Sequence, residues 1–146
     1  MKKIVIATKN QGKLREMRQA FAHLPVEVVA LDAFAEVPEP VEDGATFEEN
    51  ARIKAHAYAL ATHCACVADD SGLEVAALGG APGVHSARFS GTHGDDAANN
   101  EKLVAELAAR GLTQSAADYR CALVFEDTDG TVYTADGRCD GTVRTQ

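Results

Sequence analysis

Hydrophobic and polar positions follow one another in blocks that predict alternating strands and helices. The apolar run at residues 4–8 predicts a buried strand, and the polar residues 9–12 predict a loop after it. A helix should follow, because apolar residues then recur at helical spacing, at Leu14, Met17, Phe21 and Leu24. Pro25 should end this helix, and residues 26–30 predict a second strand.

The middle of the chain predicts an acidic loop and then a capped helix. Residues 36–49 hold six carboxylates and two prolines, so most of this stretch should be loop. Thr46 and Glu49 have the spacing of a capping box, which predicts a helix running to about His63. The apolar residues 65–68 predict another buried strand, which should end at the polar residues that follow.

The second half adds one helix and a hairpin. Residues 79–83 are rich in glycine and should form a tight loop, and residues 95–110 predict a helix. Strands at 119–126 and 131–136 flank a polar turn and read as a β-hairpin, and residues 142–146 alternate like a further strand. This order predicts an α/β fold in a single domain over 1–146, with a mixed, partly parallel twisted sheet and flanking helices.

Composition narrows the possible partners. The chain has 146 residues, of which 46% are hydrophobic, and its formal net charge is -8. This charge argues against broad electrostatic capture of nucleic acid or of an anionic membrane surface. The apolar runs are too short to span a bilayer, and we expect a cytoplasmic location. The four cysteines fit no zinc or redox spacing, so we expect them to be small structural side chains.

The turn from the first strand to the first helix is a candidate phosphate loop. A loop that enters a helix presents free backbone N–H groups, which suit phosphate, and the loop here consists of Thr8, Lys9, Asn10, Gln11, Gly12 and Lys13. Lys13 would lie in the first helical turn, where a cation opposes the helix dipole. That cost is explained if an anion lies between the helix end and the ammonium; the alternative is a solvated surface lysine.

Lys54 and Glu42 are two further candidates. Lys54 falls in the middle of the apolar face of the helix after Thr46, so its ammonium must either extend to solvent or meet an anion. We favour an anion, because a phosphate-type loop lies in the same domain. Glu42-Asp43-Gly44 ends the acidic loop before that helix, and one carboxylate near the helix start could supply a metal ligand, although most such charge runs are solvated.

Asp69 and Asp70 follow a buried strand, where ligands gather in open α/β sheets. Adjacent carboxylates repel each other, and a Mg²⁺ ion or a proton-transfer task would explain the pair. The alternative is a turn in which the two residues cap backbone donors. Spacing does not choose between the two aspartates. Together with the lysines, they suggest metal-assisted hydrolysis of a phosphate ester or anhydride.

Four blocks of this sequence resemble the inosine/xanthosine triphosphatase family, pyrophosphatases that act on noncanonical purine nucleoside triphosphates. These blocks occur in family order and cover nearly the whole chain. They are Ile4-Val5-Ile6-Ala7-Thr8-Lys9-Asn10-Gln11-Gly12-Lys13, Gly44-Ala45-Thr46-Phe47-Glu48-Glu49-Asn50-Ala51 with Lys54-Ala55, Ala68-Asp69-Asp70-Ser71-Gly72-Leu73, and the stretch from Gly79 to Phe89.

The resemblance implies a Mg²⁺-dependent homodimer that hydrolyses dITP, ITP and XTP to the monophosphate and pyrophosphate, with two lobes around a cleft. By position, it implies that the loop from Thr8 to Lys13 wraps the triphosphate. It further implies a phosphate contact at Lys54 and a substrate contact at Ser71. Asp70 would be a metal ligand and the base that activates water, and Glu42 a second metal ligand.

The sequence departs from the family at its carboxyl end. Family members continue with a Gly-Phe-Gly-Tyr-Asp loop, a further lysine and a Ser-His-Arg motif, which hold and read the purine base; none occurs here. We therefore expect an incomplete domain. The alternatives to an enzyme are a non-catalytic triphosphate-binding or dimerisation module and, less well matched, a phospho-acceptor receiver domain, whose acid pair follows the first strand.

Overall fold

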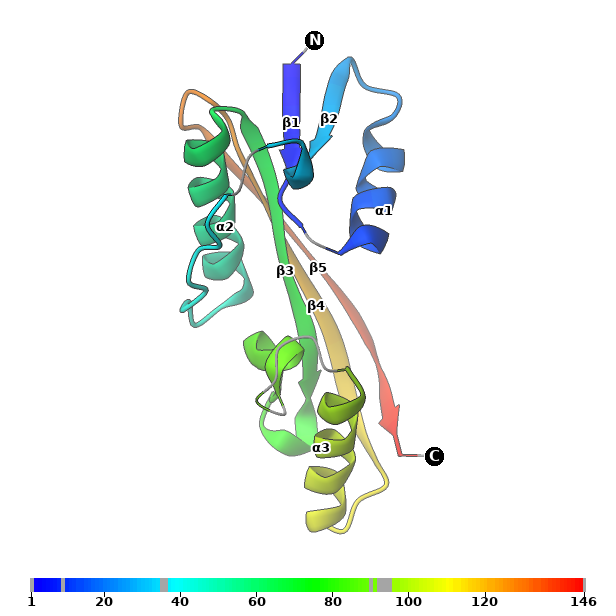
Figure 1. Ribbon diagram of the computed structural model, residues 1–146. Helices are drawn as coiled ribbons and strands as arrows, with labels where there is room; N and C mark the ends of the chain where they lie inside the picture. The colour runs from blue at the N-terminus through cyan, green and yellow to red at the C-terminus, as the bar shows by residue number, and fades with distance from the viewer. Residues whose placement is uncertain (1, 9, 35–36, 90, 92–95, 146) are drawn as a thin grey trace. The chain divides into compact units, whose positions relative to one another are not determined.

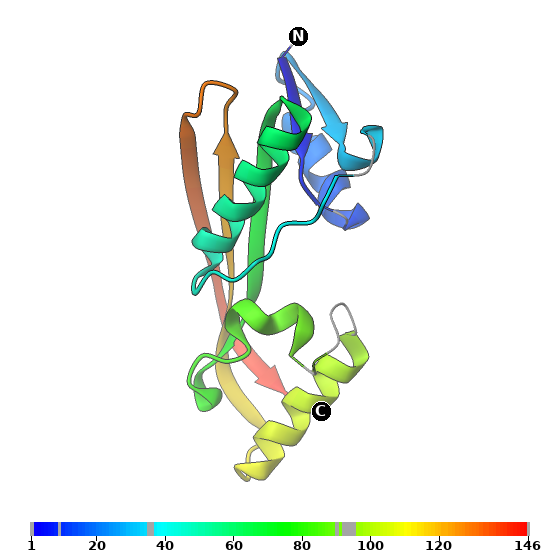
Figure 2. The same cartoon turned by 60° about the vertical axis from the view of Figure 1, so that its left-hand side comes forward.

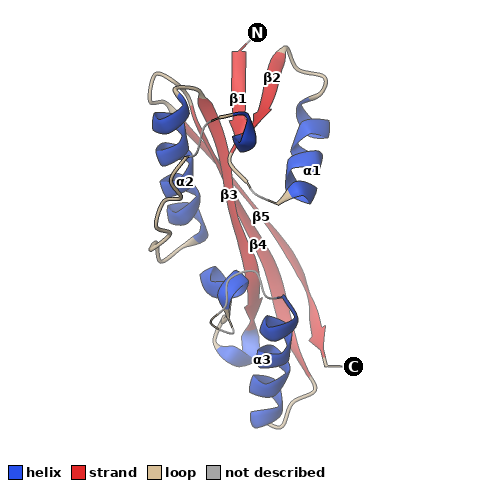
Figure 3. Cartoon of the chain, viewed as in Figure 1, coloured by secondary structure: helices blue, strands red, loops and turns tan. Residues whose placement is uncertain are grey.

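A computed structural model describes residues 2–8, 10–34, 37–89, 91 and 96–145. Within these residues the strands form one sheet in the order β2-β1-β3-β4-β5, accompanied by three α-helices (Figures 1 and 3). The elements are β1 (Lys2–Ile6), α1 (Gln11–Phe21), β2 (Val26–Ala30), α2 (Phe47–Thr62), β3 (Ala65–Val75), α3 (Asp96–Ala109), β4 (Gln114–Glu126) and β5 (Val132–Arg144). The predicted α/β class is confirmed.

The chain divides into two compact units. The first comprises Met1–Asp70 and Ala122–Ala135, and the second Ser71–Cys121 and Asp136–Gln146. Strands β3, β4 and β5 each contribute residues to both units.

The first unit is built on parallel strands. β1 pairs in parallel with β2 and with β3, with Ile4 opposite both Val28 and Ala65. β-branched side chains suit such buried strands, and Val5 and Ile6 are fully buried. β4 and β5 follow β3 in the sheet and are joined to each other by a tight turn, in which the Asp127 amide donates to the Thr131 carbonyl at 2.8 Å. Two neighbouring strands joined by a tight turn run antiparallel. The sheet is therefore mixed, as predicted.

Helix α1 covers one face of this unit. Its Leu14 packs with Ile4, Ile6 and Val67, and Met17 and Phe21 extend the same cluster. Because neighbouring strand residues point to opposite faces, Val5 and Cys66 are directed to the other face. Figures 1 and 2 show α2 on the opposite side of β1 and β3 from α1. The helix predicted to reach Leu24 ends at Phe21, where Ala22 is the C-cap.

Helix α2 begins as the capping pattern predicts. The Thr46 hydroxyl oxygen accepts a hydrogen bond from the Glu49 amide at 3.1 Å, and a Glu49 carboxylate oxygen accepts one from the Ala45 amide at 2.8 Å. The helix ends at His63, whose φ of 56° is left-handed. Its buried side consists mainly of small or aromatic residues: Phe47, Ala51, Ala55, Tyr58 and Ala59.

The prediction that the third strand ends at Ala68 was wrong. β3 continues through Asp69-Asp70-Ser71-Gly72 to Val75, so the two aspartates lie within a strand rather than in a turn. Polar residues do not end a strand when their side chains find partners inside the protein, and both carboxylates do so here. β4 and β5 are also longer than the predicted 119–126 and 131–136. Residues 142–144 belong to β5 and not to a further strand, Thr145 lies outside β5, and Gln146 lies outside the described residues.

The second unit has its own apolar cluster. Leu103 and Leu107 of α3 pack with Val75 of β3, and Phe89 and Val143 lie against them. A short loop with Gly79 at φ 67° turns the chain after β3, as the glycine pattern predicts. Among the described residues, no helix is long and apolar enough to cross a membrane.

Candidate active site

The candidate phosphate loop joins β1 to α1 in the first unit. Asn10 is the N-cap of α1, and its side-chain oxygen accepts a hydrogen bond from the Lys13 amide at 3.1 Å. The Asn10 amide in turn donates to the Thr8 hydroxyl oxygen at 3.1 Å. Gln11 and Gly12 are exposed in the first helical turn. Lys9 lies outside the described residues, so its predicted role stays a prediction.

The ammonium of Lys13 has a carboxylate partner. Its Nζ lies 2.6 Å from Oδ2 of Asp69, a side chain that is 4% exposed, whereas the Lys13 side chain is 33% exposed. No acidic residue lies in the first turn of α1. A cation at the start of a helix opposes the helix dipole, and the buried Asp69 supplies the anion that offsets this cost.

Lys54 also meets an anion, as the sequence analysis favours. Its Nζ lies 3.4 Å from Oε1 of Glu42, and the Lys54 side chain is 18% exposed. The acidic loop before α2 thus folds back so that Glu42 faces the helix. This pairing links two of the predicted site residues directly.

Asp70 is held by the buried amide of Asn50. Asn50 Nδ2 donates to Asp70 Oδ2 at 3.2 Å, while Asn50 Oδ1 accepts from the Gly44 amide at 2.8 Å. Partial burial raises the pKa of the Asp70 carboxyl, and the charges of Glu42 and Asp69 raise it further. Lys54 and the hydrogen bond from Asn50 act in the opposite direction. A carboxyl with a raised pKa is a better proton acceptor once it is ionised.

The two adjacent aspartates have different partners. Successive strand residues point to opposite faces, and accordingly Asp69 pairs with Lys13 of α1 whereas Asp70 pairs with Asn50 of α2. The sequence left the choice between them open, and the structure gives each a different environment. Sequence reasoning missed the part played by Asn50; its position one helical turn before Lys54 was the available signal.

Ser71 is the first residue of the second unit. Its hydroxyl lies 2.9 Å from the hydroxyl of Tyr119 on β4, a residue that the sequence analysis did not single out. The substrate contact predicted for Ser71 stays a prediction.

The residues suited to hold a metal are Glu42 and Asp70. In the described part of the chain, no group of three or more His, Cys, Asp or Glu side chains is arranged as a metal cluster. Mg²⁺ commonly takes one or two protein carboxylates and completes its shell with water and substrate phosphates. Two hard oxygen donors beside Lys54 fit that pattern, with phosphates expected to supply the rest.

The cysteines carry no chemistry at this site. All four are free thiols, and burial raises the pKa of the Cys66 thiol to about 12, so it stays protonated at neutral pH. Cys66 is buried, as expected of a small structural side chain, whereas Cys64 and Cys121 are half-buried and Cys139 is exposed.

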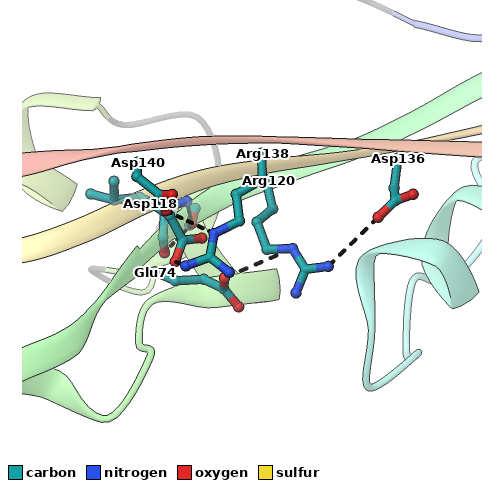
Figure 4. Close-up of polar contacts among 8 residues, drawn as sticks. Glu74, Asp118, Arg120, Asp136, Arg138 and Asp140 are labelled. Carbon is teal, nitrogen blue, oxygen red and sulfur yellow. Dashed lines mark hydrogen bonds and ion pairs between the residues drawn. The ribbon is translucent and has the colours of Figure 1, made fainter.

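A second charged cluster lies in the second unit (Figure 4). Arg120 lies 4.0 Å from Glu74 and 3.8 Å from Asp136, and Arg138 lies 3.5 Å from Asp118. Arg138 also contacts Asp140 at 2.8 Å. A hydrogen bond with Asp118 raises the pKa of Glu74, because two carboxyls in contact share a proton. The cluster joins the three long strands β3, β4 and β5.

Residues 4–146 match the model of the Ham1 family. The chain belongs to the Ham1 family. The resemblance drawn from the four sequence blocks is thereby confirmed, since curated relatives carry the name dITP/XTP pyrophosphatase. One such protein, from Syntrophobacter fumaroxidans, is 52% identical over 142 residues, which are 97% of this chain and 60% of that protein. Another, from Streptomyces avermitilis, is 46% identical over 146 residues, which are 99% of this chain and 73% of that protein.

Solved Ham1 structures share the fold. A nucleoside-triphosphatase / dITP/XTP pyrophosphatase from Mycobacterium abscessus gives a TM-score of 0.84 at 41% identity, covering 98% of this chain and 75% of that one. A HAM1 protein from Coxiella burnetii gives a TM-score of 0.90 at 34% identity, covering 100% of this chain and 75% of that one. The present Ham1 chain thus spans 60 to 75% of the length of these four proteins.

Proposed function

We propose that this Ham1 chain carries the triphosphate-hydrolysing site of a pyrophosphatase that converts dITP, ITP and XTP to the monophosphate and pyrophosphate. The names of the curated relatives support this substrate class. The structural observation that carries the proposal is the Asp70 carboxylate, half-buried and surrounded by Asn50, Lys54 and Glu42. Such an activity would clear damaged purine nucleotides from the nucleotide pool.

In this proposal the triphosphate binds at the start of α1. The exposed first turn of this helix offers backbone N–H groups, and its dipole favours an anion there. Lys13 adds a positive charge from the same turn, and Lys54 adds one from α2. An ammonium carries three N–H donors, so a lysine that is paired with a carboxylate can also contact a phosphate oxygen.

Asp70 is the proposed general base. Its carboxylate accepts a proton from a water molecule as the water oxygen bonds to the α-phosphorus. The bond from that phosphorus to the bridging oxygen breaks, which releases pyrophosphate and leaves the monophosphate. The raised pKa suits this task, because a stronger base transfers the proton more readily. Asn50 donates to Oδ2 and so restrains the orientation of the Asp70 carboxylate.

Glu42 and Asp70 would hold Mg²⁺ in this proposal. The ion, when bound, neutralises charge on the phosphates and aligns the leaving group. A homodimer, which the family resemblance implies, and a cytoplasmic location, which the short apolar runs led us to expect, complete the proposal.

The test measures pyrophosphate release from dITP, ITP, XTP, ATP and GTP by the 146-residue chain in the presence of Mg²⁺. We expect release from dITP, ITP and XTP, and the rates with ATP and GTP measure how far this chain selects the base. Calorimetric titration of the same nucleotides detects the alternative function directly. Binding of Mg²⁺-triphosphate without release of pyrophosphate would show a non-catalytic triphosphate-binding module and would contradict the proposal.

A further inference from the structure

We propose that Asp69 is a positioning residue, which fixes the Lys13 ammonium for the phosphate-bond cleavage assigned above; this inference rests on the proposed function. The sequence left Asp69 and Asp70 as equivalent candidates. The structure separates them, because Asp69 is the buried partner of Lys13 and Asp70 is the half-buried partner of Asn50.

Burial makes Asp69 a strong anchor. Its side chain is 4% exposed and its Oδ2 lies 2.6 Å from Lys13 Nζ, the geometry of a charge-assisted hydrogen bond. A carboxylate this deeply buried requires a cationic partner, so the ammonium cannot leave it without exposing an uncompensated charge. The pairing between β3 and α1 is therefore held more firmly than an exposed ion pair on the protein surface.

Lys13 is fixed at its backbone as well. Its amide donates to the Asn10 side chain at 3.1 Å, which places the residue in the first turn of α1. An unpaired lysine has four flexible carbons and high rotamer entropy, and it would sample many positions around that turn. Asp69 restricts this freedom at the ammonium, the part of the lysine side chain that would contact the phosphate. The ammonium carries three N–H donors, one of which is directed at Asp69 Oδ2.

This arrangement predicts a separation between affinity and turnover. In Asp69→Asn the Lys13 charge remains, and a negative charge next to the phosphates disappears, so ground-state attraction for the triphosphate is kept or increased. The ammonium, however, is no longer held at one point. We expect kcat to fall by about tenfold, because a small displacement of a group that stabilises the transition state is costly, while KM is not raised.

A double-variant cycle tests the inference. If Asp69 acts through Lys13, then Asp69→Asn lowers kcat in the Lys13 chain and changes it by less than about twofold in a Lys13→Met chain. Lys13→Met alone leaves the Asp69 charge buried without a partner and should be the least stable chain of the four. The double variant should recover thermal stability but not turnover. Recovery of both would show a purely structural pair and would overturn the proposal.

Lysine ammonium signals in ¹H–¹⁵N spectra provide a readout that is independent of turnover. The wild-type chain should give a protected Lys13 signal that is absent from Lys13→Met and lost in Asp69→Asn. Three results would each overturn the inference. They are absence of that signal from the wild-type chain, an unchanged kcat in Asp69→Asn, and an equal loss of kcat on Asp69→Asn in the chain with Lys13 and in the Lys13→Met chain. A wild-type chain that shows the signal but releases no pyrophosphate would overturn the proposed function, and the role of Asp69 with it, while leaving the ion pair intact.

Discussion

The buried amide of Asn50 joins the Gly44 backbone to the Asp70 carboxylate. Its oxygen accepts from the Gly44 amide at 2.8 Å and its nitrogen donates to Asp70 Oδ2 at 3.2 Å. A single side chain on α2 thus holds both the loop before that helix and the aspartate on β3. The first two predictions concern this link.

Replacement of Asn50 by alanine should weaken both the fold and the site. The change leaves the half-buried Gly44 amide without its acceptor and Asp70 without a donor, and we expect the free energy of unfolding to fall by about 1–3 kcal/mol. Turnover should fall as well, because the carboxylate loses its orientation. Chemical denaturation and pyrophosphate release measure the two effects. Asn100→Ala, at an exposed position of α3, is the matched control and should change neither by much.

Gly44→Ala tests the same link by steric means. A Cβ at Gly44 would lie 2.7 Å from Asn50 Oδ1 and 2.7 Å from the Cβ of Glu49, so the loop or the amide must move. We expect a cost of about 1–3 kcal/mol in the free energy of unfolding, comparable to overpacking a core. Gly137→Ala is the control, since nothing lies within 4 Å of a Cβ there. Equal melting temperatures for the two variants would contradict the close packing at Gly44.

Removal of the α2 cap should destabilise the helix that carries Asn50 and Lys54. The Thr46 hydroxyl oxygen accepts from the Glu49 amide at 3.1 Å, and Thr46→Ala leaves that donor to water. The expected loss is about 1 kcal/mol in the free energy of unfolding, as for other N-cap threonines. Thr46→Ser, which keeps the hydroxyl, should retain most of the stability. A Ser variant as unstable as the Ala variant would show that the hydroxyl is not what caps this helix.

Glu74 should make the stability of the second unit depend on pH. Contact with Asp118 raises the pKa of Glu74, so the folded state binds a proton more tightly than the unfolded chain (Figure 4). The resulting stabilisation is fully present below the ordinary glutamate pKa, and it is lost as pH rises through the raised value. In Glu74→Gln the glutamine amide donates to Asp118 but does not titrate, so the pH-dependent part of the stabilisation should vanish. Unfolding measured across mildly acidic to neutral pH should therefore show a smaller decline for Glu74→Gln than for the wild-type chain.

The sequence predicted the parts of the site that depend on local pattern. The cap of α2 at Thr46 follows from a spacing of three residues, and the strand-to-helix loop ending at Lys13 follows from an apolar run and a helical period. Both involve residues close together in the chain. Such short-range relationships are visible without knowledge of the fold.

The pairings across the fold could not be read from the sequence. Lys13 and Asp69 are 56 residues apart, and Asn50 and Asp70 are 20 apart, so each contact depends on how a helix packs against β3. The polar residues Asp69 and Asp70 also suggested the end of a strand. Because their partners lie on helices on either side, the strand continues through them.

Single-turnover release of pyrophosphate from dITP, measured for the wild-type chain and for Asp70→Asn, tests the central claim most directly. Asparagine keeps the shape of the side chain but cannot accept the proton from water. If Asp70 is the general base, the variant should be slower by about 100-fold or more while it still binds the nucleotide. Equal rates for the two chains would contradict the account.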